Sequence, residues 1–433
     1  MQRTSFSLAD ISRVAAKLLR HHERHSQDLF NRAPKAIEQA GLLLSTRGSK
    51  LWKQALEAGE ATGMSPEMVE EALKNFTKHL RGKQLSKIRE KQLRHIPPRV
   101  RVYPRIIFHV LAGNLFLSGW ESMLLGTLLG ACNIVRTSSH DPLFPHIWVK
   151  ALSQADSLFA DANFVGWWPH EENALTSALI QSADAVVAFG DNSSVGAIRS
   201  LVPLHTRFVG HGHKLSFALV EGSLLDDDTL SCNLARAAAY DFSVYDQQGC
   251  LSPRCLFIQG GSEKCIKRFA EYIVDFMCQL SHALPLHKLT LEEAATLARE
   301  REEALIEYSA TASKTSRDKD FSATTVFSAP SDKFLVMRRS LAPFAPSPVN
   351  RVVTIRTFKT TNELKKVLEP YRGLISTFGV SSPRDEWLHL AKTLLVGRVC
   401  SLGNMQKPPL GWTHDGYQPL AALVTSMELG ELK

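Results

Sequence analysis

From Val100 onward, short runs rich in apolar and β-branched residues alternate with longer runs that have helical spacing, and this pattern most constrains the fold. The first runs predict a strand over Ile106 to Leu111, a helix over Trp120 to Gly130 and a strand over Asn133 to Arg136. Such alternation is typical of a parallel sheet covered by helices on both faces. The chain is therefore expected to be an α/β protein.

The alternation continues far along the chain and predicts a second α/β domain. Further strands are expected at 185–189, 256–258, 351–358, 373–378 and 398–402, and further helices at 263–280, 291–306 and 384–395. A domain boundary is expected between Lys214 and Asp228. The first hundred residues are expected to be helical, since Ser65 and Pro66 form a helix start that apolar residues follow at helical spacing.

Composition limits the class of protein. With 433 residues, 44% hydrophobic and 22% charged, the chain can hold two or three globular domains, and fibrous or disordered classes are excluded. The amino terminus has no uninterrupted apolar core, and the longest apolar-rich stretch, Ser122 to Ala131, is too short to span a bilayer. Seven cysteines without a CxxC pair fit reduced thiols. We therefore expect a soluble cytoplasmic protein with no membrane span.

The net charge of +8 and the isoelectric point near 9.1 suit anionic partners, such as phosphorylated cofactors, coenzyme A or an acidic carrier protein. No zinc-finger spacing, aromatic RNA-binding motif or long basic run is present, so no nucleic-acid partner is expected.

One thiol stands between small or polar residues, in Asp246-Gln247-Gln248-Gly249-Cys250-Leu251-Ser252-Pro253. A reactive cysteine needs a polar, exposed setting that favours the thiolate. The helical pattern over Leu230 to Tyr240 is expected to break at Asp241, which would place Cys250 on a loop. The alternative is a buried thiol without chemistry.

Two predicted strand ends could bind a nucleotide. Phe189-Gly190 leads into a helix start at Asp191-Asn192-Ser193-Ser194-Val195-Gly196, where free N–H groups could meet a phosphate. The alternative is a simple turn capped by Asp191 or Asn192. After the strand ending at Arg136, Ser139 and His140 could face a phosphate or ribose, or lie on a solvated loop. Asn114, also at a strand end, could donate to an oxyanion or merely form a turn.

The histidines allow a metal hypothesis that we discount. His205, His211 and His213 lie close in sequence without an evident third ligand pattern. The segment Gly411-Trp412-Thr413-His414-Asp415-Gly416 could hold a catalytic His-Asp pair, but adjacent residues rarely bond side chain to side chain in that geometry, so a structural turn is expected. No metal site is predicted.

In order and spacing, Asn114, Arg136, the Gly190 turn, the segment 210–214 and Cys250 resemble the aldehyde dehydrogenase superfamily. The resemblance covers roughly residues 101–420. The nearest resemblance is to the long-chain acyl-CoA reductases similar to the fatty-acid reductase component of bacterial luminescence. Gln248-Gly249-Cys250-Leu251-Ser252-Pro253 and the segment 411–416 carry it most specifically.

This resemblance implies an aldehyde-dehydrogenase-like fold: a Rossmann-type cofactor domain, an α/β catalytic domain and a helical N-terminal segment. The expected ranges are 1–100 for the helical segment, 101–222 for the dinucleotide-binding domain, 223–400 for the catalytic domain and 401–433 for a segment returning to the cofactor domain or to an oligomer interface. The resemblance implies Cys250 as nucleophile and Asn114 as oxyanion donor. The cofactor-binding residues it implies are Arg136, Ser139, His140, Gly190, Ser193 and Gly196.

Departures from the family pattern shape the expected activity. Oxidising members have a glutamate base where this chain has Gly210, so a thioacyl-enzyme should survive to be reduced. The family's NAD-selecting glutamate is absent at Ser139, which favours NADPH, with Arg136 and His140 as partners of its 2′-phosphate. The segment 345–350 replaces a motif that contacts the nicotinamide ribose in many members.

The expected function is NADPH-dependent reduction of a fatty acyl thioester, with long chains favoured, to the aldehyde through a thioacyl-cysteine. The acyl donor is coenzyme A or acyl carrier protein, and the resemblance allows for an acyl-transferring partner protein and implies a homo-oligomer. Two alternatives stay open: an NAD(P)-dependent aldehyde dehydrogenase that oxidises aldehydes, and a non-catalytic subunit that binds acyl groups or a carrier protein.

Overall fold

The computed structural model describes residues 6–428 except 114, 118, 313–323 and 328–332. The chain divides into two compact units. The first comprises Met1–Thr62, Val69–His213 and Pro409–Lys433, and the second comprises Gly63–Met68 and Lys214–Pro408.

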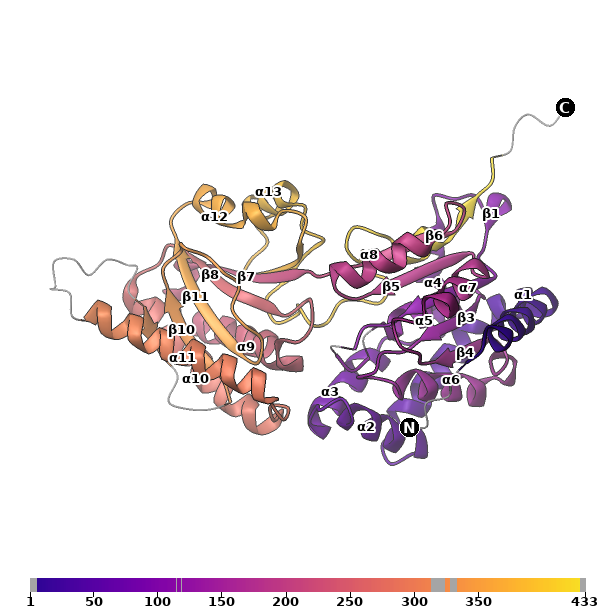
Figure 1. Cartoon of the computed structure of the whole chain (residues 1–433). Coiled ribbons are helices and arrows are strands. Elements are labelled where there is room, and N and C mark those ends of the chain that lie inside the picture. Colours follow the sequence, from indigo (N-terminus) through magenta and orange to yellow (C-terminus); the bar gives the residue numbers. More distant parts are fainter. Residues whose placement is uncertain (1–5, 114, 118, 313–323, 328–332, 429–433) are drawn as a thin grey trace. The chain divides into compact units, whose positions relative to one another are not determined.

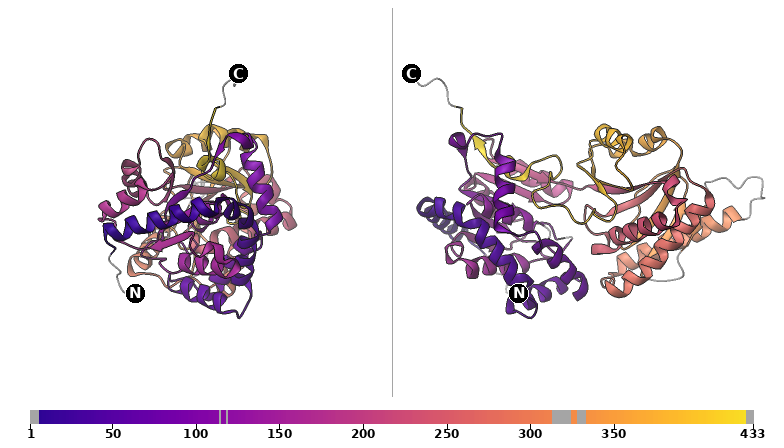
Figure 2. Two further views of the ribbon diagram at one scale, coloured as in Figure 1. Left: turned by 90° about the vertical axis from the view of Figure 1, so that its right-hand side faces the viewer. Right: turned by 180° about the vertical axis from the view of Figure 1, so that it is seen from behind.

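The N-terminal hundred residues are helical, as the sequence predicts. The four helices are α1 Leu8–Ser45, α2 Lys50–Glu60, α3 Pro66–Thr77 and α4 Gly82–Leu93, and α1 is the long indigo helix in Figure 2. A capping box between Ser7 and Asp10 starts α1. The Ser65 hydroxyl accepts the Met68 N–H at 3.3 Å, which confirms the predicted start of α3.

The first unit contains a five-stranded parallel sheet in the order β4-β3-β2-β5-β6. Its strands are β2 Ile106–Val110, β3 Cys132–Arg136, β4 Asn163–Gly166, β5 Ala185–Phe189 and β6 Arg207–His211. The helices along this part of the chain are α5 Trp120–Leu128, α6 Phe144–Ala155, α7 Asn173–Gln181 and α8 Asn192–Leu201. The first four residues of β2, β3 and β5 are all buried, as expected for a parallel sheet covered on both faces.

The C-terminal segment belongs to the first unit. It forms α14 Pro419–Leu423 and β14 Thr425–Ser426, and β14 pairs antiparallel with β1 Arg101–Val102. The Gln92 side chain of α4 donates to the Gly411 carbonyl at 2.5 Å and accepts the Leu420 N–H at 2.7 Å. These bonds anchor both ends of the stretch that contains the predicted His-Asp motif.

The second unit contains a seven-stranded sheet in the order β13-β12-β7-β8-β11-β10-β9, in which only β9 runs antiparallel to its neighbour among the described strands. The strands are β7 Leu215–Glu221, β8 Pro253–Gln259, β9 Thr325–Val326, β10 Leu335–Arg339, β11 Val352–Phe358, β12 Ile375–Val380 and β13 Arg398–Ser401. The helices are α9 Asp228–Ser243, α10 Glu263–Ala283, α11 Leu291–Ala312, α12 Thr361–Leu368 and α13 Asp385–Leu394.

Alternate residues of the central strands β7 and β8 enter two different cores. Ala218 and Leu256 pack with α9 and α10 on one face, whereas Phe217 and Phe257 pack with α12 and α13 on the other. Figure 1 shows the same two helical layers on either side of this sheet. The strand period of two therefore builds both cores from one run of apolar residues.

The predicted end of the helix before the thiol is wrong. We expected the helix before the thiol to break at Asp241, but α9 continues to Ser243. The Asp241 carboxylate accepts the backbone N–H groups of Gly403 at 2.5 Å and Met405 at 3.2 Å. Its side chain therefore bonds to a distant segment and does not compete with the helix backbone.

Among the described residues, no helix is both long enough and apolar enough to cross a lipid bilayer.

Candidate active site

Cys250 lies exposed in a turn between the short 3-10 helix Val244–Gln247 and β8. The three residues before Gln248 all have left-handed backbone angles, with φ of 57° at Tyr245, 51° at Asp246 and 61° at Gln247. Each such residue costs on the order of 1 to 3 kcal/mol and persists only where its surroundings fix it. The location of Cys250 on a turn agrees with the sequence prediction.

Buried side chains hold the strained residues. Asp246 accepts from the Arg351 guanidinium at 2.7 Å and 2.6 Å, and both side chains are at most 2% exposed. The Gln247 amide donates to the Pro253 and Val352 carbonyls at 2.8 Å and 3.0 Å and accepts the Val352 N–H at 2.6 Å. The backbone before Cys250 is therefore fixed by residues from the start of β8 and β11.

The residues at and after the thiol are fixed as well. The buried Ser216 hydroxyl on β7 donates to the Cys250 carbonyl at 2.7 Å and accepts the Thr377 N–H at 3.2 Å. The Gln406 amide donates to the buried Ser252 hydroxyl at 2.7 Å. An exposed thiol on a rigid main chain is a suitable arrangement for a nucleophile. No local sequence signal singled out Ser216 or Gln406 as parts of this site.

The first unit has a topological switch point between β2 and β5. The chain adds β3 and β4 on one side of β2, and β5 and β6 on the other. Open α/β sheets bind ligands at the carboxyl ends of the strands beside such a point. The Gly190 turn follows β5 at this edge, and the segment after Arg136 follows β3, which lies on the other side of β2.

The Gly190 turn begins α8, and its first turn is exposed from Asp191 to Ser194. A Cβ at Gly196 would meet no atom within 4 Å, so this part of the helix is open to a ligand. Asp191 caps the helix by accepting the Ser194 N–H at 2.8 Å. Hydrogen bonds from Ser193 and Ser194 lower the pKa of Asp191 to about 2. The capping alternative weighed from the sequence thus describes Asp191, and Gly196 lies on an open side of α8.

The neighbouring strand end offers both an arginine and exposed polar groups. Arg136 is partly buried and donates to the Trp168 carbonyl at 3.2 Å and 3.3 Å. Ser139 and His140 are exposed. The structure thus brings Arg136, Ser139 and His140 to one edge of the sheet, and it places Cys250 in the other unit.

The proposed oxyanion donor Asn114 lies outside the described residues. Its neighbour Gly113 is tightly enclosed, because a Cβ there would come within 1.9 Å of the Ser138 hydroxyl. Only glycine lets these two strand-end segments approach so closely.

A side chain at the position of the missing glutamate would force its neighbours to move. A Cβ at Gly210 would lie 2.7 Å from the Phe208 ring and 2.8 Å from a Val195 methyl group. These distances are far inside normal van der Waals contact. A base at this position would therefore require Phe208 and Val195 to shift.

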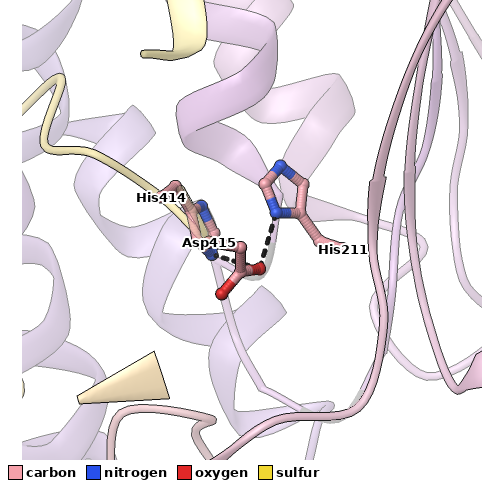
Figure 3. A group of neighbouring side chains, drawn as sticks. All are labelled: His211, His414 and Asp415. Atoms are coloured by element: carbon pink, nitrogen blue, oxygen red, sulfur yellow. Dashed lines mark hydrogen bonds and ion pairs between the residues drawn. The ribbon is translucent and has the colours of Figure 1, made fainter. Parts of the chain in front are cut away.

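Asp415 bonds to a histidine remote in sequence. Its Oδ2 lies 2.9 Å from His211 Nδ1 and 3.6 Å from His414 Nε2 (Figure 3). The sequence singled out His414-Asp415 but gave no indication that His211, at the end of β6, would be the nearer partner. His205 and His213 are exposed and lie outside this cluster.

The cluster is a stack of rings. His211 stacks on Phe189 and on His414, with centroids 4.6 Å and 4.0 Å apart, and His414 stacks on Trp412 at 4.5 Å. The possible ligand atoms of His211, His414 and Asp415 lie within 4.8 Å of one another. An imidazole nitrogen binds a metal along a direction in the plane of its ring. In stacked rings these binding directions run side by side and do not meet at one point. The geometry therefore favours a hydrogen-bonded group over a metal centre.

The partly buried Glu121 of α5 adds a second carboxyl to this part of the first unit. It accepts the Gly411 N–H at 3.1 Å. Burial raises the pKa of Glu121, although hydrogen bonds from Gly411 and Trp412 oppose the shift. The segment 411–416 is therefore fixed to α5 as well as to α4.

Comparison with known proteins supports the family resemblance. The family model described as Acyl-CoA reductase (LuxC) matches residues 48–426. The long-chain acyl-protein thioester reductase of Vibrio harveyi is 24% identical over 329 residues, 75% of this chain and 64% of the relative. That of Photorhabdus laumondii is 25% identical over 329 residues, 73% of this chain and 62% of the relative. The match thus spans less than two thirds of the length of these relatives.

Solved structures show the fold. An oxidoreductase from Marinobacter aquaeolei matches with a TM-score of 0.69 and 11% identity, covering 92% of this chain and 85% of that one. An NAD-dependent benzaldehyde dehydrogenase from Corynebacterium glutamicum matches with a TM-score of 0.68 and 11% identity, covering 97% and 89%. The aldehyde-dehydrogenase-like fold expected from the sequence is confirmed. Because the family model matches residues 48–426, most of this chain, the chain belongs to the LuxC family of acyl-CoA reductases.

Proposed function

We propose that the protein is an acyl thioester reductase that transfers an acyl group to Cys250 and releases it as an aldehyde. The observation that carries the proposal is the exposed thiol of Cys250 on a turn whose flanking residues Asp246, Gln247 and Ser252 are buried and hydrogen-bonded. The printed names of the curated relatives, long-chain acyl-protein thioester reductases, support the same chemistry.

In the first half of the reaction, the Cys250 thiolate attacks the acyl carbonyl and the donor's thiolate leaves and takes up a proton. Ser216 holds the Cys250 carbonyl, so the peptide group between Cys250 and Leu251 keeps one orientation. We assign the Cys250 N–H and, from the sequence alone, Asn114 as donors to the oxyanion.

In the second half, the thioacyl-cysteine becomes a thiohemiacetal anion that collapses, releases the aldehyde and regenerates the Cys250 thiolate. When bound, NADPH supplies the hydride for this step. Gly210 supplies no base, and a Cβ at this position would press against Phe208 and Val195. Without a base to activate water, the thioester is protected from hydrolysis.

For the cofactor we propose NADPH bound at the switch-point edge of the first unit. The Gly190 turn, Ser193 and the open side of α8 at Gly196 would face the pyrophosphate. Arg136 and His140 would face the 2′-phosphate, and Ser139 brings no carboxylate to repel it.

The substrate would be a fatty acyl thioester of coenzyme A or of acyl carrier protein. A protein that transfers acyl groups would be a further partner. We also propose that the protein works as a homo-oligomer in the cytoplasm, where a nucleophilic thiol stays reduced.

Intact mass measurement tests the proposal. After incubation with a fatty acyl-CoA and no reductant, the wild type should gain one acyl group that Cys250→Ala does not. Cys278→Ala is the matched control, since Cys278 is also exposed. Equal labelling of wild type and Cys250→Ala would refute the assignment. Release of free acid from aldehyde without coenzyme A would instead identify an aldehyde dehydrogenase, and no NADPH oxidation with any acyl donor would identify a binding subunit.

A further inference from the structure

His287, which precedes α11, lies between two carboxylates. Its Nδ1 is 3.0 Å from Asp246 Oδ2, and its Nε2 is 3.2 Å from Glu293 Oε1. A neutral imidazole has one N–H donor, so it could satisfy only one of these contacts. Both ring nitrogens can donate only in the imidazolium form. The geometry therefore indicates a charged His287.

Both carboxylates connect His287 to the turn that carries the thiol. Asp246 stands four positions before Cys250 and has one of the left-handed backbones. Glu293 accepts from the Gln248 amide at 3.3 Å, and Asn350 accepts from the same amide at 2.8 Å. Asn350 in turn donates its N–H to the Asp246 carbonyl at 2.9 Å. His287 thus joins α11 to two residues of the turn.

Three charged groups surround this imidazole: Asp246 from the 3-10 helix, Glu293 from α11, and Arg351, which bonds to Asp246. Burial alone would lower the pKa of His287, but the hydrogen bonds and charges of Asp246 and Glu293 outweigh it and raise the pKa. Loss of the proton would leave a ring nitrogen lone pair facing a carboxylate oxygen and break one of the two links.

We propose that charged His287 is a positioning residue for the nucleophile: by bridging Asp246 and Glu293, it holds the turn that presents Cys250 for acylation. This inference rests on the proposed role of Cys250 as acyl acceptor. Acylation rises with pH as the thiolate forms and falls at higher pH as His287 loses its proton. The rate of acylation therefore has a maximum against pH.

The test is the single-turnover rate of Cys250 acylation by a fatty acyl-CoA, followed by intact mass without NADPH across neutral and alkaline pH. His287→Gln should slow acylation about tenfold or more, because a misplaced nucleophile reacts slowly. Its acylation rate should also no longer fall at alkaline pH. Glu293→Gln keeps an oxygen that can accept from Gln248 but removes a negative charge. The alkaline fall should then move to lower pH.

His170→Gln is the matched control, because this side chain is 85% exposed, and it should keep the wild-type profile. Circular dichroism and melting temperature show whether each variant is folded; if His287→Gln is not, Glu293→Gln decides the inference. If the acylation rate of Glu293→Gln falls at the same alkaline pH as that of the wild type, the positioning role is overturned. A wild type that gains no acyl group at any pH would overturn the proposed function instead.

Discussion

At the scale of single residues, the chemistry of the thiol depends on side chains far from it in sequence. Ser216 lies on β7, 34 positions before Cys250, yet its hydroxyl bonds to the Cys250 carbonyl. That carbonyl belongs to the planar peptide group that joins Cys250 to Leu251, so the bond fixes the main chain on the C-terminal side of the nucleophile.

Ser216→Ala should slow acylation of Cys250 by roughly tenfold, since one anchor of the nucleophile's main chain is lost. The measurement is single-turnover acylation followed by intact mass. Ser376→Ala is the matched control, because Ser376 lies buried on the adjacent β12 and its hydroxyl makes no bond to the thiol turn. Equal rates for the two variants would contradict the role given to Ser216.

Asp241 should make stability depend on pH. Burial raises the pKa of Asp241 to about 7, although the N–H groups of Gly403 and Met405 oppose the shift. An unfolded aspartate has a pKa of about 3.9. Because the folded state binds this proton more tightly, the stability it contributes is full below about pH 4 and is lost as pH rises toward 7, at most about 4 kcal/mol.

Urea unfolding at several pH values measures this effect. The free energy of unfolding of the wild type should fall between pH 4 and pH 7 relative to that of Asp241→Asn, which has no proton to lose there. Parallel pH curves for the two proteins would show that Asp241 does not titrate in this window.

At the scale of elements, α8 combines an open backbone with an anionic cap. The Asp191 carboxylate accepts from Ser194 at the helix start, where the positive end of the helix dipole would otherwise favour a phosphate. A bound pyrophosphate would therefore be repelled by Asp191.

Asp191→Asn should keep the cap, because asparagine also accepts an N–H there, and should tighten NADPH binding by about two- to fivefold. Calorimetric titration measures the dissociation constant. Asp227→Asn is the matched control, since Asp227 caps α9 with the same bond geometry, accepting the N–H three residues ahead at 2.9 Å, and should leave NADPH affinity unchanged. Weaker binding in Asp191→Asn would exclude α8 as the pyrophosphate site.

Local signals predicted elements well where the physics is local. Ser65 and Pro66 predicted the start of α3, and the strand ending at Arg136 was placed within one residue. The central strand β7 was not predicted, because the strand and its register depend on pairing with β8 and β12, which no local pattern reveals. For the same reason, the sequence drew attention to Asp415 and to His211 separately but did not reveal that the two side chains pair.

At the scale of the whole molecule, the alternation of strands and helices predicted a parallel sheet and further α/β structure after it. The structure has a five-stranded parallel sheet and a seven-stranded sheet in which, among the described strands, only β9 is antiparallel to its neighbour. The sequence indicated a thiol turn and a nucleotide edge. The side chains that fix the thiol turn include Ser216 on β7, Arg351 just before β11 and Gln406, which bonds to Ser252 across 154 positions. Such contacts follow from the fold as a whole, so only the exposed and chemically distinctive residues could be identified beforehand.

The net charge of +8 predicts how the protein responds to salt. A positive protein attracts anionic acyl donors over distances that ionic strength controls, with a Debye length of about 10 Å at 0.1 M and 3 Å at 1 M. Raising the salt concentration should therefore lower kcat/KM for acyl-CoA several-fold. The same acyl group on a small uncharged thiol should react with a kcat/KM that changes little. Steady-state NADPH oxidation with the two donors makes the comparison, and equal salt dependence would mean that salt acts on the protein or the cofactor and not on the charge of the donor.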